Sequence, residues 1–286
     1  MLDRVDRVQL AVRDRHAAAT TFAELLGARP ARDADSAYLG AHRTVLALGE
    51  SELELCEPTG AVLVREHLER WGEGLLTAGF AVRDMTDLHA WLAEEGAEFA
   101  EDGDQTYLEP SQTAGVRVVL TPARPVARAG ARLYEVTNTL VSDWRAAAER
   151  YARLFALDPA RFSPITSERF GYVGTLALFD PPARLDRIEL SQVVKPASAM
   201  GRWVARRGDS LYMAYLETDD VPAVVRRLEA RGARWTPRGA DPKTERDGLW
   251  IHPSALHGLL LGVSRTTLAW EWSGRPQLVR PGGERR

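Results

Sequence analysis

The chain repeats one pattern of apolar and polar positions four times. In each copy a strand of alternating apolar residues leads to an acidic residue, and an amphipathic helix follows and ends near a glycine or an equivalent residue. The predicted helices cover residues 16–27, 85–96, 144–157 and 221–232. The acidic residues at the N-cap positions are Asp14, Asp84, Asp143 and Asp219 or Asp220. Short strands follow each helix, so every copy predicts a β-α-β-β-β unit.

The four units predict an α+β fold with curved mixed sheets, because strands cluster between the helices instead of alternating with them one for one. One unit cannot bury both faces of its small sheet, so the units are expected to pair into two domains. The predicted domains are residues 1–123 and 133–265, joined by a linker at 124–132 that is rich in Pro, Ala and Arg. A C-terminal extension at 266–286 carries Trp270 and Trp272, which alternate like a strand face.

The composition limits the kinds of molecule that this protein is expected to bind and the compartment in which it is expected. The 286 residues carry a net charge of −3 with no separate basic stripe, so nucleic acid is not expected. No apolar run is long enough to span a membrane, and the N-terminus has no apolar signal core. The single cysteine, Cys56, excludes an intrachain disulfide and suits the cytoplasm, where we expect this protein. Cys56 lies in a strand-like run and is predicted to be a core residue.

Motifs in both halves point to a family. The first half carries LELCEPTG, HLERWGEGLLTAGFAVRDMTDLHAWLAEEGAEF and YLEPSQTAGVRVVL, and the second half repeats this layout from RIELSQVV to WIHPSALHGLLLGV. Over residues 1–265 the chain resembles the vicinal-oxygen-chelate superfamily (glyoxalase, bleomycin resistance protein, extradiol dioxygenase), with a layout similar to methylmalonyl-CoA epimerase-like members. The resemblance implies two tandem domains of four βαβββ units. It does not fix the function, because one fold can carry many activities.

The same resemblance implies where metal ligands would stand. In the first half these positions hold Arg7, Glu54, Thr77 and Val119. In the second half they hold Glu189, Met213, Gly262 and either Val136 or Glu135, since the register of that strand is open. Arginine has no lone pair to offer and valine has no donor, so the metal site is expected to be degenerate or absent. A divalent Zn, Mn, Ni, Co or Fe ion remains a candidate cofactor, with Glu189, Glu135, His252 and His257 as the candidate ligands.

The two histidines stand five residues apart around Pro-Ser-Ala, which indicates a turn and not the helical spacing of a zinc-binding HExxH motif. Local hydrogen-bonding roles are therefore favoured for His252 and His257. The alternative is a substrate-binding role at the rim of a cleft.

Strand alternation places other side chains in the two clefts. The candidate catalytic residues are Glu189 and Glu54, because a carboxyl in a partly apolar pocket can have a raised pKa and act as a general acid or base. Arg7 is predicted to pair with Glu54, the alternative being that it grips an anionic ligand. Gly79 and Gly262 are expected to leave space for a ligand. The candidate substrate-binding residues are Arg7, Gln9, Arg117, Asn138, Met213, Tyr215, Glu217, Trp250, His252 and His257.

Three functions fit these features. The first is an isomerase or lyase acting on an acyl thioester, keto acid or aromatic metabolite. The second is a protein that binds and sequesters a small molecule or antibiotic without catalysis, and the third is a domain that serves only assembly. The expected partner in the first two is a small molecule, and a homodimer is the candidate assembly.

Overall fold

The computed structural model describes residues 1–125, 130–181, 184, 186–238 and 248–265. The predicted C-terminal extension and part of the predicted linker lie outside the described residues. The exact domain boundaries therefore stay predictions.

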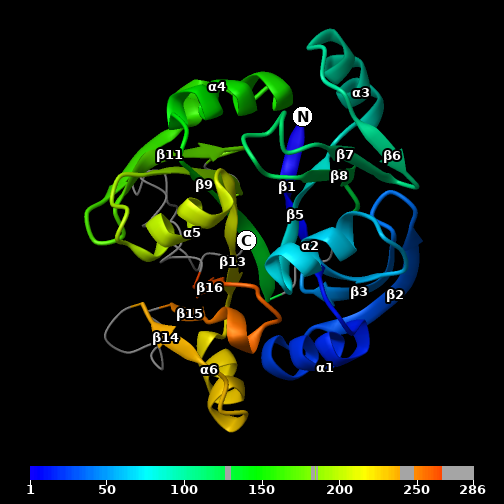
Figure 1. The fold of residues 1–286 in the computed structure, drawn as a ribbon, viewed down its shortest axis with the longest axis vertical. Coiled ribbons are helices and arrows are strands. Elements are labelled where there is room, and N and C mark those ends of the chain that lie inside the picture. Colours follow the sequence, from blue (N-terminus) through cyan, green and yellow to red (C-terminus); the bar gives the residue numbers. More distant parts are fainter. Residues whose placement is uncertain (126–129, 182–183, 185, 239–247, 266–286) are drawn as a thin grey trace, which may run out of the picture.

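The first half of the chain forms one curved, mixed, eight-stranded sheet (Figure 1). Its strands follow the order β2-β3-β4-β1-β5-β8-β7-β6. The central strand β1 is parallel to β4 and antiparallel to β5. The strands are β1 (Leu2–Ala11), β2 (Arg29–Ser36), β3 (Ala41–Leu48), β4 (Ser51–Pro58), β5 (Gly74–Val82), β6 (Ala100–Asp102), β7 (Gln105–Leu108) and β8 (Val118–Pro122).

The second half repeats this sheet strand for strand, in the order β10-β11-β12-β9-β13-β16-β15-β14. Its central strand β9 is parallel to β12 and antiparallel to β13. The duplication and the α+β fold expected from the sequence are thereby confirmed. The strands are β9 (Ala131–Leu140), β10 (Ser163–Ser167), β11 (Tyr172–Leu178), β12 (Arg187–Val193), β13 (Ser210–Thr218), β14 (Trp235–Pro237), β15 (Leu249–Ile251) and β16 (Leu261–Ser264).

Four of the helices are those the repeat predicts, and aspartates begin them. The side chains of Asp14, Asp84, Asp143 and Asp220 accept hydrogen bonds from backbone N–H groups of the first turn. Two further helices, α2 and α5, lie between the units of each half and were not among the predicted helices. The helices are α1 (Arg15–Leu26), α2 (Leu63–Trp71), α3 (Met85–Glu94), α4 (Trp144–Phe155), α5 (Ala199–Arg207) and α6 (Val221–Ala230).

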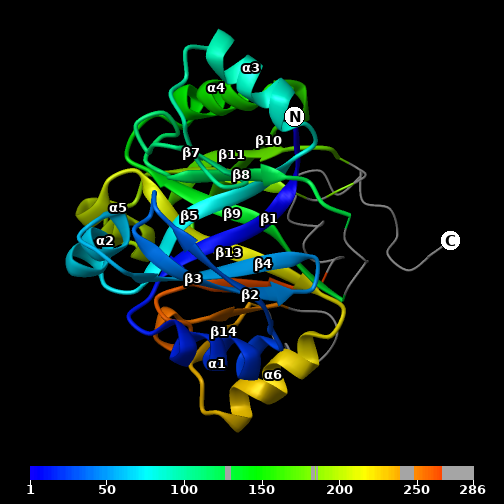
Figure 2. The ribbon, with the colours of Figure 1, turned by 90° about the vertical axis from the view of Figure 1, so that its right-hand side faces the viewer.

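The two halves pack against each other through one pair of helices at each end of the molecule. Helix α1 contacts α6 at one end of the molecule, and α3 contacts α4 at the other end (Figures 1 and 2). One hydrophobic core joins both sheets and includes Val8 of β1 and Val136 of β9. The opposite face of each sheet carries its own smaller cluster, with Cys56 fully buried in the first, as predicted, and Met213 in the second.

Bulges in the two central strands shift the strand alternation. The register of β1 against β5 skips Asp6, and the register of β9 against β13 skips Tyr134. The residue after each bulge, Arg7 or Glu135, therefore points away from the shared core. This settles the open register in the second half in favour of Glu135. Among the described residues, no helix is long and apolar enough to cross a membrane.

Candidate functional site

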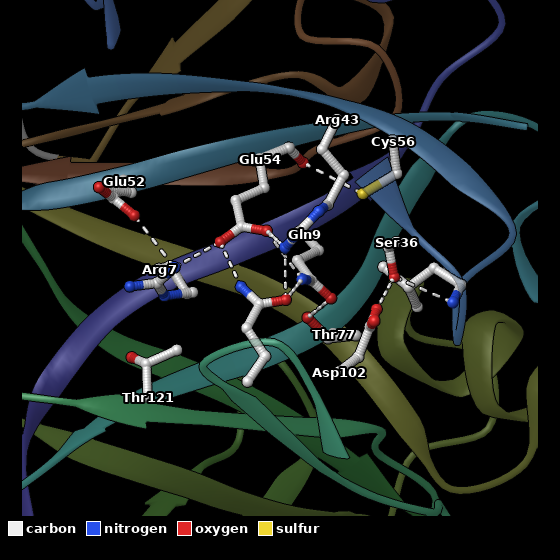
Figure 3. A network of polar contacts seen from close by, with 12 residues as sticks. Arg7, Gln9, Ser36, Arg43, Glu52, Glu54, Cys56, Thr77, Asp102 and Thr121 are labelled. Atoms are coloured by element: carbon white, nitrogen blue, oxygen red, sulfur yellow. Dashed lines mark hydrogen bonds and ion pairs between the residues drawn. The ribbon is translucent and has the colours of Figure 1, made fainter. Parts of the chain in front are cut away.

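The face of the first sheet that could form a cleft is filled by its own polar side chains (Figure 3). Glu54 on β4 lies at the centre with none of its surface exposed. It forms ion pairs with Arg7 of β1 and with Arg43 of β3, the latter at 2.9 Å. The predicted pair of Arg7 and Glu54 is thus confirmed. Arg7 also pairs with Glu52 at 3.0 Å and Asp6 at 2.8 Å, so its charge is fully balanced.

Amide groups complete this network. Gln9 donates to Glu54 at 2.9 Å and to the Tyr107 hydroxyl at 3.0 Å, and it accepts from the Thr77 hydroxyl at 2.9 Å. Gln105 of β7 donates to Glu54 at 2.8 Å. Glu54 and the four residues Gln9, Thr77, Gln105 and Tyr107 are each at most 2% exposed. The arrangement holds a carboxylate in place and leaves it no open side.

The electrostatics agree with a fixed anion. Burial alone would raise the pKa of Glu54, but the charges of Arg7 and Arg43 and the hydrogen bonds from Gln9 and Arg7 lower it below its ordinary value. Glu54 is therefore ionised at neutral pH and already fully bonded. Gly79 leaves no free space, because a Cβ atom there would lie 2.1 Å from Cγ of Arg7. The expectation that Gly79 makes room for a ligand was wrong: the Arg7 side chain fills that room.

Arg117 does not join this network. It bonds to Glu109 at 2.7 Å and to the Tyr38 hydroxyl at 3.1 Å. The sequence placed Arg117 in the cleft because it alternates with Val119, but β8 begins only at Val118. Arg117 therefore belongs to the loop before the strand.

The corresponding face of the second sheet encloses a cavity of about 1000 Å³. This volume is at the upper end of the range for small-molecule sites, which is about 300–1,000 Å³. Its walls are largely aromatic and apolar. Strands of the second sheet and helix α5 contribute residues to them. The aromatic residues that line it are Tyr134, Phe170, Tyr172, Trp203, Tyr212, Tyr215 and Trp250.

Glu189 lies in this cavity at the position that Glu54 occupies in the first half. It is 7% exposed and receives hydrogen bonds from Ser191 and, at 3.2 Å, from Thr137. Burial, the negative charge of Glu135 and a hydrogen bond with Glu135 raise the pKa of Glu189 to about 8. Most molecules therefore carry a neutral carboxyl group here at neutral pH, and a minority carry the carboxylate.

Glu135 lies beside Glu189 and also lines the cavity. It pairs with Arg187 through the guanidinium Nε. Arg187 is 2% exposed and likewise lines the cavity. Glu189, Glu135 and Arg187 together form the floor of the cavity. The acid Glu189 lies there next to the ion pair of Glu135 and Arg187.

Of the other predicted ligand-binding residues, Met213, Tyr215, Trp250 and His252 line the cavity. Gly262 does not widen it, since a Cβ there would lie 2.2 Å from the Tyr215 ring. As at Gly79, the room beside the glycine is taken by a neighbouring side chain, and that expectation was also wrong. Here the neighbour is itself a wall of the cavity.

Two predicted residues, Asn138 and Glu217, lie outside the cavity. Asn138 is on the opposite side of β9 and donates to the backbone oxygen of Ala114 at 2.8 Å, because the bulge at Tyr134 reverses the alternation that the sequence suggested. Glu217 pairs with Arg132. These two side chains tie strands and halves together, and they do not face a ligand.

The two histidines take separate places. His252 lies next to the short 3-10 turn at Pro253–Ala255 and bonds to the Thr236 hydroxyl at 2.7 Å at the edge of the cavity. His257 bonds to Glu73 at 2.9 Å and to the Thr21 hydroxyl at 3.1 Å, both in the first half. The turn expected from Pro-Ser-Ala is present, and His257 joins the halves.

The donor set does not fit a resident divalent metal. Among the described residues, no three His, Cys, Asp or Glu side chains come together to hold an ion. Glu135 and Glu189 are two carboxyl groups, whereas the usual catalytic sites use three protein ligands. The positive charge of Arg187 already balances Glu135.

Sequence reasoning missed several residues of both faces. Arg187 stands two residues before Glu189, so strand alternation alone could have found it. Arg43, Gln105 and Tyr107 come from strands that the sequence did not assign to the site. Only the sheet order brings β3 and β7 to Glu54.

Residues 6–124 match the family model of the glyoxalase/bleomycin resistance protein/dioxygenase superfamily. The N-terminal half of the chain belongs to this superfamily. The second half repeats the sheet of the matched half strand for strand, so the fold is that of two tandem domains. A search of curated protein sequences finds no match.

Two solved structures share the fold over 92% of the chain. A mutant of 4-hydroxymandelate synthase from Streptomyces coelicolor is 15% identical, with a TM-score of 0.69 and 92% of each chain covered. A fusion of a xylose isomerase-like TIM barrel with 4-hydroxyphenylpyruvate dioxygenase is 12% identical, with a TM-score of 0.63, 92% of this chain and 48% of that chain covered. Methylmalonyl-CoA epimerase from Mycobacterium tuberculosis is 18% identical over 43% of this chain and 90% of its own, with a TM-score of 0.40. The first two likenesses show the fold alone and no activity.

Proposed function

We propose that this superfamily member is an isomerase or lyase that moves a proton on a small molecule bound in the second-half cavity. The substrate class is an acyl thioester, keto acid or aromatic metabolite. The observation that carries the proposal is the position of Glu189, a buried carboxyl with a pKa of about 8 at the floor of a cavity of about 1000 Å³. Acids and bases with a pKa near the working pH transfer protons most effectively.

The residues around Glu189 suit this role. Ser191 and Thr137 donate to its two oxygens and so fix the carboxyl plane. Aromatic rings and Met213 form the walls, which favours a flat or acyl molecule and excludes water from its reacting carbon. In the ionised minority, Glu189 takes a proton from the substrate, and the resulting acid returns the proton to carbon or to a leaving group.

A proton-exchange assay tests this function. The protein is incubated in D2O with a panel of acyl thioesters, keto acids and aromatic acids, and loss of C–H signal is followed by proton NMR. We expect exchange with at least one class, and Glu189→Gln should slow it by about 10²–10⁴-fold while the protein stays folded. Glu149→Gln, on the exposed face of α4, is the matched control and should keep full exchange.

The pH profile adds a second criterion. Because the carboxylate of Glu189 is the active form in proton abstraction, the exchange rate should rise about tenfold per pH unit and level off above about pH 8. A rate that is flat between about pH 6 and about pH 9 would argue against Glu189 as the base.

The alternative function is binding without catalysis, and the aromatic lining of the cavity favours it. Trp203 and Trp250 line the cavity, so a bound aromatic compound should quench tryptophan fluorescence. Quenching in both the original protein and Glu189→Gln, with no exchange by any compound that quenches, would identify a sequestering protein.

A further inference from the structure

The floor of the cavity holds a cation that the proposed proton transfer does not yet use. Arg187 of β12 is 2% exposed and lines the cavity two residues before Glu189. Its Nε donates to Glu135, and the guanidinium carbon lies 5.2 Å from the centroid of the Tyr134 ring. These two contacts hold the guanidinium in one orientation.

One nitrogen of this guanidinium lacks an acceptor. Within the described part of the chain, Nη1 of Arg187 is buried and has no hydrogen-bond partner. A buried charged donor without an acceptor destabilises the folded protein. Buried donors of this kind are normally satisfied, and an oxygen of a bound molecule would satisfy this one.

The charges that line the cavity favour an anionic molecule. Four exposed cations line it, and among the described residues the acidic side chains that line it are Glu135 and Glu189. Of these two, Glu135 is paired with Arg187. A concave site with an excess of one charge concentrates ligands of the opposite charge. The exposed lining cations are Arg169, Lys195, Arg202 and Arg206.

We propose that Arg187 binds the carbonyl or carboxylate oxygen of an organic acid or acyl compound and stabilises the negative charge that forms on this oxygen. The inference rests on the proposed function and adds to it the group that stabilises the negative charge. The Glu189 carboxylate takes the proton from the carbon next to the carbonyl, and the electrons of the broken C–H bond move to the carbonyl oxygen. Arg187 donates an N–H to the resulting enolate, and return of the proton from Glu189 to carbon restores the carbonyl. The guanidinium thus supplies a fixed positive charge in a cavity whose donors do not fit a metal.

A pair of probes tests Arg187 directly. Binding of 2-naphthoate and of its neutral analogue 2-naphthamide is measured by calorimetry for the original protein, Arg187→Met and Arg206→Met. We expect the original protein to prefer the anion by about tenfold or more, which corresponds to about 1.4 kcal/mol. Arg187→Met should remove this preference, whereas Arg206→Met, the same change at an exposed lining cation, should keep most of it.

Arg187→Met leaves Glu135 unpaired, so folding is checked by circular dichroism and thermal unfolding. If that variant does not fold, Glu135→Gln is compared with the double variant Glu135→Gln, Arg187→Gln, which differs from it only at Arg187. An unchanged preference for 2-naphthoate in the folded variant lacking Arg187 overturns the inference. Binding of neither probe by the original protein also overturns the inference, whereas the proposed function is decided by the exchange assay.

Two further outcomes distinguish the role of Arg187 from the proposed proton transfer. Glu189-dependent exchange that is unaffected by loss of Arg187 leaves the proton transfer standing and removes Arg187 from it. A preference for the anion that depends on Arg187, with no exchange by any compound of the panel, keeps Arg187 as a binding residue in a protein that is not a catalyst.

Discussion

The two halves of this protein place a buried glutamate at the same point of the same sheet and give it opposite properties. Glu54 pairs with Gln9 across β1 and β4, and Glu189 pairs with Thr137 across β9 and β12 in the same register. Yet the pKa of Glu54 lies below its ordinary value, and that of Glu189 is raised to about 8. Identical backbone positions therefore do not determine the chemistry, and the neighbouring side chains do.

The strand registers identify the neighbours that differ. Arg43 stands opposite Cys56, two residues after Glu54, and Gly174 stands opposite Ser191, two residues after Glu189. The second half thus has no side chain where the first half has an arginine. Likewise, the pair formed by Arg7 and Glu52 is reversed in the second half, where Glu135 faces Arg187. In the second half, one arginine is absent and the other has exchanged places with its carboxylate partner. Glu189 therefore lies next to a carboxylate, whereas Glu54 lies between two arginines.

Among the predictions that test this difference between the halves, replacing Arg7 has the largest expected effect on stability. Arg7→Met leaves Glu54 with one arginine and removes the ion pairs that Arg7 makes with Asp6 and Glu52. The free energy of unfolding in denaturant should therefore fall by about 3–5 kcal/mol. Arg32→Met is the matched control, because Arg32 pairs with Glu52 near the surface and should cost about 1 kcal/mol or less. A loss below about 0.5 kcal/mol for Arg7→Met would mean that the first cleft is not held by this ion pair.

The pH dependence of stability should separate the two glutamates. The pKa of Glu189 is higher in the folded protein than in the unfolded chain, so the folded state binds the extra proton between about pH 5 and about pH 8. The free energy of unfolding should therefore fall as pH rises through this window, by up to about 1.4 kcal/mol per pH unit from this group. Glu189→Gln should remove that slope. Denaturant titrations at several pH values measure it, and an unchanged slope would contradict the raised pKa.

Glu54 should act at the other end of the pH scale and in the opposite direction. Its folded pKa lies below the unfolded value of 4.5, so its contribution is present above that pH and is lost as pH falls further. Glu54→Gln should flatten the acid side of the stability curve and leave the slope between about pH 5 and about pH 8 unchanged. If Glu54→Gln altered the same window as Glu189→Gln, the two halves would not be electrostatically independent.

Replacing one glycine of each sheet by alanine gives the smallest expected difference between the two halves. At Gly79 the new Cβ meets the Arg7 side chain and, at 2.9 Å, the Arg7 backbone oxygen, and at Gly262 it meets the Tyr215 ring. Arg7 has no space to move into, so Gly79→Ala should cost about 1–3 kcal/mol. The Tyr215 ring borders the cavity, so Gly262→Ala should cost less stability and should instead change ligand affinity. Thermal unfolding with fluorescence titration compares the two, and equal losses of stability would show that the Tyr215 ring cannot move.

Local patterns in the sequence determined most of the fold. The aspartate N-caps and the four helices depend on contacts within a few residues, and so they could be recognised without tertiary structure. The same is true of the strand alternation that put Arg7 and Glu54 on one face and made Glu189 a candidate. Cys56 as a core residue follows from the same alternation.

The state of each cleft depended on contacts that the sequence pattern cannot show. The bulge at Tyr134 turned Glu135 toward the cavity and Asn138 away from it, and an unpaired extra residue leaves no mark in an alternating sequence. Gln105 reaches Glu54 from a strand about fifty residues away in sequence, and only the sheet order makes them neighbours. The first cleft is closed and the second is open because burial and nearby charge act through space, and the tertiary structure alone brings those charges together.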